Sequence, residues 1–390
     1  MLACMGPLPD PLAGQRAALA SLAPPTQGWA PQAVLALSPT TLEQGVTDAV
    51  NGVLGRGLAP LNATAMGVTA SLEPTAEVAE VQLMASDACE SCLELRVELR
   101  GAATAALSNS TGAKRLSMGF TGGLRGVMAL SFDGEQLLAQ PAALDRWSAT
   151  MAWEALPAGF SQAVSGLFTD ALRRQLNLTS LPPIPVVRLR GETPVPVTAL
   201  RVRPEGEQIV VDFAFAVPSA GVAAAPREPV QGWLLVVPVE TALGLMQAVA
   251  LAQPYNPNER ATPEFTGLRA EGSGFELDLR AWPTRARARP RDVTVTGMFG
   301  LDASGDLAAV AQGARWVRER GDPPDLTALL LGDRLLDGLV AALSGSMPGQ
   351  RAQGFGGLEL VATTTSASAS EGALRISGQL ALAGSGRSVP

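Results

Sequence analysis

Alternating apolar and polar side chains mark the clearest strand of the chain, over residues 92–100. Leu95 and Val97 lie on its apolar face, and Glu94 and Arg96 lie on the opposite face. A sheet with one apolar face and one wet face is typical of antiparallel rather than buried parallel strands. Weaker patterns of the same kind predict further strands of one meander over about 66–73, 77–84, 114–121, 124–132 and 147–153.

Two segments around this meander have helical periodicity instead. The first follows Ser38-Pro39, a pair that suits the N-cap and the first helical position, and its apolar repeat continues to Leu58. The second covers about 157–177 and is followed by the proline-rich run 181–185, which predicts its end. The apolar stripes of the two helices contain Leu42, Val46, Val50, Val53 and Leu54, and Phe160, Val164, Leu167, Phe168 and Leu172.

The same order of elements returns in the second half of the chain. Strands are predicted over about 198–203, 207–217, 233–237, 265–271, 274–282, 291–300, 306–316, 357–365 and 373–382. Helices are predicted over 239–252, with Leu243 and Met246, and over 325–345, with Leu336 and Val340. The repeat is one of element order rather than of residues. It predicts an N-terminal tether over 1–34 and two modules, over 35–195 and 196–390.

Composition narrows the chemistry that this chain can perform. The 390 residues include no histidine, which excludes Ser-His-Asp and Cys-His catalysis and the histidine-based metal sites. The net charge of −7 provides no global basic surface for nucleic acid. We expect no enzyme, metal or cofactor, although a hydrolase that uses two carboxylates is compatible with the sequence.

The three cysteines suggest a compartment. Ala3-Cys4 resembles the end of a bacterial lipobox, in which the cysteine carries a lipid anchor, whereas an incidental free cysteine is the alternative. Cys89 and Cys92 precede a strand, so we favour a disulfide-closed turn in an oxidising compartment over a zinc site or a thioredoxin-like motif. Together they suggest a periplasmic or secreted protein, or a lipoprotein anchored to the outer membrane.

The doubled order of helix, antiparallel meander and helix resembles the tubular lipid-binding superfamily, which includes the bactericidal/permeability-increasing and lipopolysaccharide-binding proteins. The resemblance covers about residues 35–385, and the proline run 181–185 is similar to the way such modules leave their second helix. It implies an elongated α+β fold of two modules. Each module would wrap a strongly bent antiparallel sheet around long amphipathic helices, with a central sheet between the two modules.

The same resemblance implies an apolar tube for lipid acyl chains in each module. The 47% of hydrophobic residues, with only 4% aromatic, suits such a tube, although an ordinary close-packed core uses the same residues. The candidate lipid-binding side chains are Leu42, Val46, Val50, Val53, Leu54, Leu95, Val97, Phe160, Val164, Leu167, Phe168, Leu172, Leu243, Met246, Leu336 and Val340. Arg285, Arg287 and Arg289 are candidates for a lipid phosphate, or for a solvated edge that blocks strand pairing.

The leading hypothesis is therefore a protein of the bacterial envelope that binds lipid or phospholipid acyl chains, and shields or shuttles them without chemistry. It would associate with a membrane through an anchor on Cys4. The alternative is a structural or interaction lipoprotein that has the same fold and holds no lipid.

Overall fold

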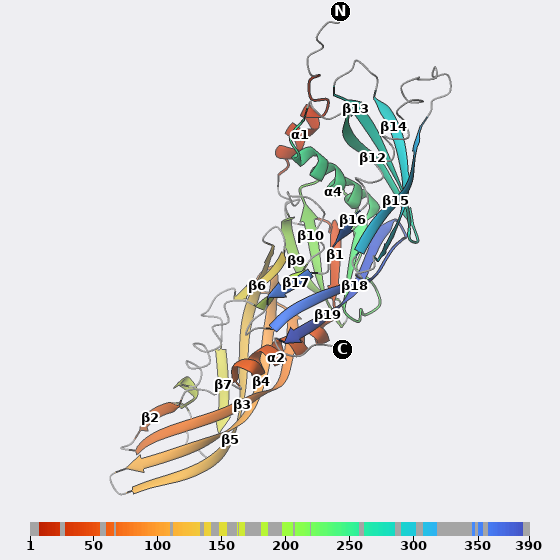
Figure 1. The fold of residues 1–390 in the computed structure, drawn as a ribbon. Helices are drawn as coiled ribbons and strands as arrows, with labels where there is room; N and C mark the ends of the chain where they lie inside the picture. The colour runs from red at the N-terminus through yellow and green to blue at the C-terminus, as the bar shows by residue number, and fades with distance from the viewer. Residues whose placement is uncertain are drawn as a thin grey trace, which may run out of the picture.

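The computed structural model describes residues 8–23, 28–54, 60–65, 68–109, 112–132, 136–141, 148–153, 162, 164–167, 181–185, 197–205, 207–218, 220–256, 261–284, 290–301, 307–317, 345–347, 350–353 and 358–384. The molecule is elongated, with a sheet at each end and a third sheet between them (Figure 1). All pairings between the described strands are antiparallel, as the sequence predicts.

The central sheet draws its strands from both ends of the chain. In spatial order they are β17 (Gln350–Gln353), β18 (Leu358–Ser370), β19 (Ala373–Gly384), β11 (Trp233–Pro238), β1 (Ala33–Leu37), β10 (Gln208–Phe215) and β9 (Val197–Glu205).

Each end sheet is a meander of strands that follow one another in the sequence. The first end sheet contains β2 (Leu61–Ala65), β3 (Val68–Ala85), β4 (Cys92–Asn109), β5 (Gly112–Phe132), β6 (Gln136–Pro141) and β8 (Leu181–Pro185), with β7 (Ser148–Trp153) paired to β5. The second end sheet contains β12 (Ala261–Glu271), β13 (Gly274–Pro283), β14 (Arg291–Leu301), β15 (Leu307–Trp316) and β16 (Gly345–Met347).

Two units with the same order of strand, helix, end sheet and hairpin meet in the middle of the central sheet. Strands β1 and β11 are antiparallel neighbours, and each leads directly into a helix, α2 (Pro39–Leu54) or α4 (Val239–Ala252). Each helix is followed by an end sheet and then by a hairpin, β9–β10 or β18–β19, that returns beside the starting strand. This duplication divides the chain in the loop over 218–232, whereas the predicted division near residue 195 precedes β9 and β10.

The predicted helices are described only in part. Helices α2 and α4 are present, residues 162 and 164–167 of the helix predicted over 157–177 are helical, and the helix predicted over 325–345 lies outside the described residues. Because the described chain is mainly strand, the wrapping of each sheet around two long helices stays a prediction.

Two segments differ from their predicted roles. The proline-rich run 181–185 forms strand β8, which pairs with β6. Residues of the predicted tether form helix α1 (Ala13–Ala20), which packs against α4. Leu12 is buried there, and the Arg16 guanidinium donates to the carbonyl oxygen of Leu251 at the end of α4. A basic side chain there satisfies carbonyl groups that have no partner within the helix.

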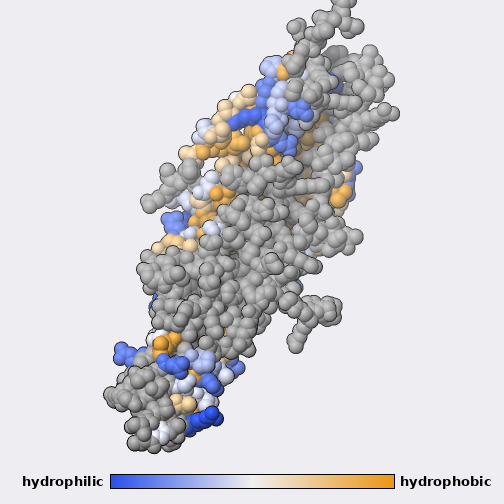
Figure 2. Space-filling view, turned by 60° about the vertical axis from the view of Figure 1, so that its left-hand side comes forward, coloured by the Kyte–Doolittle hydropathy of each residue, from blue (hydrophilic) through white to orange (hydrophobic). Residues whose placement is uncertain are grey.

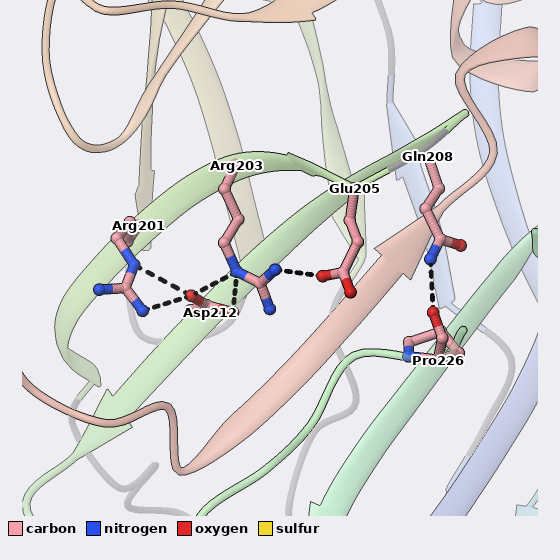
Figure 3. A network of polar contacts seen from close by, with 6 residues as sticks. All are labelled: Arg201, Arg203, Glu205, Gln208, Asp212 and Pro226. Carbon is pink, nitrogen blue, oxygen red and sulfur yellow. Dashed lines mark hydrogen bonds and ion pairs between the residues drawn. The ribbon is translucent and has the colours of Figure 1, made fainter. Parts of the chain in front are cut away.

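A buried carboxylate joins two strands of the central sheet (Figure 3). The side chain of Asp212 on β10 is fully buried, and its Oδ2 accepts hydrogen bonds from Nη2 of Arg201 at 2.7 Å and from Nε of Arg203 at 3.1 Å, both on β9. Arg203 also pairs with Glu205. Burial opposes the charge on Arg203, but its hydrogen bonds to Asp212 and Glu205 outweigh burial and raise the pKa of the guanidinium.

We predict that Asp212→Asn destabilises the protein. The substitution keeps the shape of the side chain, removes the carboxylate partner of Arg201, and leaves Arg203 with Glu205 alone. Breaking a buried ion pair costs about 3–5 kcal/mol, and we expect the lower end because both arginines are about one-third exposed. The free energy of unfolding in urea measures the loss, and an unchanged midpoint would contradict it.

A second ion-pair cluster lies on the outer face of the first end sheet. Polar side chains predominate on the described surface at this end (Figure 2). Arg96 on β4 and Arg125 on β5 are directly opposite each other, and Glu94 contacts both guanidinium groups. Its hydrogen bond to Arg125, with a smaller contribution from Arg96, lowers the pKa of the Glu94 carboxyl below its ordinary value of 4.5 despite the opposing effect of burial.

We predict that the stability advantage of the native protein over Glu94→Gln depends on pH. A carboxyl with a lowered pKa in the folded state stabilises the fold above its unfolded pKa, and the effect is lost as pH falls through the folded pKa. The difference in melting temperature between the native protein and Glu94→Gln should be largest above about pH 5 and should shrink at lower pH. A difference that grows on acidification would contradict this assignment.

Candidate functional site

One apolar core extends from the first end sheet to the inner face of the central sheet and reaches α4. Six predicted lipid-binding side chains are buried in it: Val46, Val50, Leu54, Leu95, Val97 and Val164. Leu167 is partly buried against the same core. The structure therefore brings together apolar side chains from α2, from β4 and from the partly described helix near residue 164.

A second, smaller core lies on the inner face of the second end sheet. It consists of Phe275, Leu277, Leu279, Val293, Val295 and Ala311. Of the two predicted lipid-binding residues on α4, Met246 packs against this core, whereas Leu243 is half-buried and belongs to neither core. The strand residues of this core are absent from the predicted set, which took its second-module residues from helices alone.

The remaining predicted positions fall outside the part of the chain that the structure describes. The side chains of Leu42 and Val53 on α2 lie outside the described residues. The same is true of Phe160, Phe168, Leu172, Leu336, Val340, Arg285, Arg287, Arg289 and Cys4.

Helix α2 closes the edge of the first end sheet through two side-chain acceptors. Strand β4 pairs with one edge of β3, and β2 pairs with the other edge only at residues 68–72, so the rest of that second edge has no paired strand in the described chain. Asn51 Oδ1 accepts from the Val78 N–H at 2.8 Å, and Glu43 Oε1 accepts from the Leu83 N–H at 3.0 Å. A register shift between Val78 and Glu80 allows two amides five residues apart to point outward from the same edge.

Helix α4 closes the second end sheet in the same way. Gln247 Oε1 accepts from the Phe265 N–H on edge strand β12 at 2.7 Å, again beside a register shift, between Phe265 and Gly267. An edge amide without an acceptor is costly and invites pairing with another chain. These hydrogen bonds hold each helix to an edge strand, while Val50 of α2 and Met246 of α4 pack against the adjoining apolar core.

A row of residues crosses the inner face of the first end sheet. Ala76, Gly101, Phe120 and Trp153 are successive partners on β3, β4, β5 and β7. A Cβ atom at Gly101 would lie 2.5 Å from Cζ of Phe120, so the glycine makes room for that ring. The Phe120 and Trp153 rings are 4.8 Å apart.

A surface pocket lies on β3 and β4 between the stretch paired with β2 and the stretch held by α2. It has a volume of about 420 Å³ and is lined by Thr75, Ala76, Glu77, Arg100, Gly101 and Ala102. Glu77 and Arg100 form an exposed ion pair of 2.6 Å in its wall.

The predicted disulfide is confirmed. Cys89 and Cys92 are joined and close the turn between β3 and β4. The carbonyl of Glu90 in this turn accepts from the Val202 N–H of β9 at 2.6 Å, and the carbonyl of Ser91 accepts from the Leu130 N–H of β5 at 2.8 Å. The closed turn thus connects the first end sheet with the central sheet.

Within the described residues, acidic side chains and cysteines form no group of three or more that could hold a metal ion. No described helix is long and apolar enough to cross a membrane.

No family model and no curated protein matches the sequence. Two solved structures are similar over 90% of this chain and 99% of their own: a lipopolysaccharide binding protein (11% identity, TM-score 0.40) and P47 of Clostridium botulinum E1 (9% identity, TM-score 0.41).

Sequence reasoning missed the polar residues that hold the helices in place. Glu43, Asn51 and Gln247 interrupt or flank apolar stripes, and their positions on otherwise apolar helix faces were the available signal. Their partners are backbone amides, which no side-chain pattern reveals.

We predict that Asn51→Leu exposes the edge of β3. The variant keeps the size of the side chain but leaves the Val78 N–H without its acceptor, at a cost of about 1 kcal/mol. Hydrogen exchange at Val78 should become faster, whereas Asn51→Asp keeps an acceptor oxygen and serves as the control. Equal protection of Val78 in all three proteins would contradict the anchoring role.

Proposed function

We propose that this protein binds the acyl chains of lipids along the apolar inner faces of its end sheets. The observation that carries the proposal is the extent of the first core. Strand β4 has 18 residues and spans roughly 60 Å, whereas α2 has 16 residues and spans about 24 Å. The buried core positions of β4 run from Leu93 to Ala103, roughly 33 Å of that strand, so the apolar face is longer than the helix that is held over it.

Buried positions mark this face along the strands. Leu72 and Ala103 are buried beyond the position where Asn51 binds β3, and Leu95 and Leu83 are buried on the other side of it. An inner face of this length, lined by aliphatic side chains, is chemically matched to a linear hydrocarbon chain.

The duplicated path supports one binding region in each unit. The second core is smaller, but it has the same relation to its helix and its edge strand. We further propose that the protein works in the bacterial envelope and shields or shuttles lipid there, held to a membrane by a lipid on Cys4. The disulfide suits an oxidising compartment of this kind.

Lipid uptake tests the proposal. The purified full chain is incubated with vesicles that contain a radiolabelled phospholipid, separated from them, and examined by native mass spectrometry. We expect bound lipid in the native protein and a loss of at least tenfold in Val50→Asp, because a buried carboxylate opposes both packing and an apolar ligand.

Val222→Asp is the matched control, since Val222 is 71% exposed and lies in the loop over 218–232. Circular dichroism checks that both variants are folded. A folded native protein that carries no lipid and takes up none would contradict the proposal. A stable complex with another envelope protein in that case would support the structural alternative.

A further inference from the structure

Two indole N–H groups in the end sheets are buried and have no hydrogen-bond partner within the described structure. Trp153 is 9% exposed, and Nε1 of both Trp153 and Trp316 is buried without an acceptor in the described structure. Most buried polar groups in proteins are hydrogen-bonded, and a buried donor without a partner is destabilising. The indole of Trp282, by contrast, donates to Glu264 at 2.7 Å.

Both indoles belong to apolar interiors. Trp153 is a member of the first core and lies against Phe120. Trp316 packs against the second core, and its partner across the strands is the fully buried Val293. Trp153 therefore places its N–H donor among aliphatic and aromatic side chains, and Trp316 places its own beside the second core, with the Arg291 guanidinium 5.7 Å from the centre of its ring.

The two tryptophans occupy equivalent places in the two units. Counted from the helix-bound edge strand, Trp153 lies on the fourth strand of its row, after Ala76, Gly101 and Phe120. Trp316 also lies on the fourth strand, and its row contains Val293, Leu279 and Phe265. Phe265 is the residue whose amide Gln247 binds. Each unit therefore has an unpartnered indole N–H on the fourth strand of a row that crosses its inner face.

A third buried indole without a partner has a different setting. Trp233 lies in the central sheet, and a Cβ atom at Gly378 would be 2.5 Å from its Cε2. Its ring is stacked closely on the neighbouring strand, outside the rows of the end sheets.

We propose that Trp153 and Trp316 each donate a hydrogen bond to an acyl oxygen of the bound lipid, either an ester carbonyl or a carboxyl oxygen. The inference rests on the proposed function and specifies the ligand: a chain with an oxygen acceptor is preferred over a plain hydrocarbon of the same length. In each unit the acyl oxygen lies beside the fourth strand, and the hydrocarbon part extends along the apolar inner face.

Three probes with sixteen-carbon chains test the preference: hexadecanoic acid, its methyl ester and hexadecane, each radiolabelled. In the double variant Trp153→Phe/Trp316→Phe, we expect roughly tenfold weaker binding of the acid, the ester or both. Hexadecane binding should be unchanged, because phenylalanine keeps an aromatic ring. If the double variant binds only one of the two oxygenated probes more weakly, that probe shows whether the carboxyl or the ester oxygen is bound. Trp29→Phe is the control, since Trp29 lies against Arg201 of the central sheet.

A measurement on the native protein avoids dependence on variant folding. In ¹H–¹⁵N spectra, the indole N–H signals of Trp153 and Trp316 are assigned by their absence from the single variants. They should move downfield with an oxygenated probe and not with hexadecane. Binding of all three probes without a selective shift or selective loss would overturn this inference and leave the proposed function intact. Failure of every probe to bind the native protein would overturn both.

Discussion

The pairing of β1 with β11 is the interaction on which the arrangement of this molecule depends. It joins the first strand of one unit to the first strand of the other, with Leu35 opposite Leu235 at its centre. All five residues of β1 are buried, because the core covers one face and the loop over 218–232 covers the other. Since each of these strands leads straight into a helix, their pairing directs α2 and α4 toward opposite ends of the molecule (Figure 1).

The second constraint is the free backbone edge that every open sheet leaves. Here Asn51, Glu43 and Gln247 satisfy edge amides from helices, so the polar requirement of the backbone positions an apolar helix face over each sheet. Fold and candidate site are therefore linked: the same contacts that close an edge also enclose the interior in which we propose that acyl chains bind.

Much of this architecture was predictable, because apolar and polar side chains alternate strictly along a strand that has one solvent-exposed face. The segment over 92–100, helix α2 and the repeated order of elements all followed from periodicity. Strand β1 was missed because burial on both faces removes alternation, and β8 was missed because prolines suggested only the end of a helix. Helix α1 was hidden by a composition typical of linkers, although Leu12 is buried and Arg16 binds the end of α4.

The candidate site was predictable only in its apolar part. Helical spacing identified Val46 and Val50, but no sequence pattern shows that the indole of Trp153 lacks an acceptor.

The most direct test of the account is a crystal structure of the protein with a brominated fatty acid. Anomalous peaks should lie on the inner face of the first end sheet, near Val50 and Phe120. Peaks confined to the outer faces, with the interior occupied by protein side chains alone, would contradict the account.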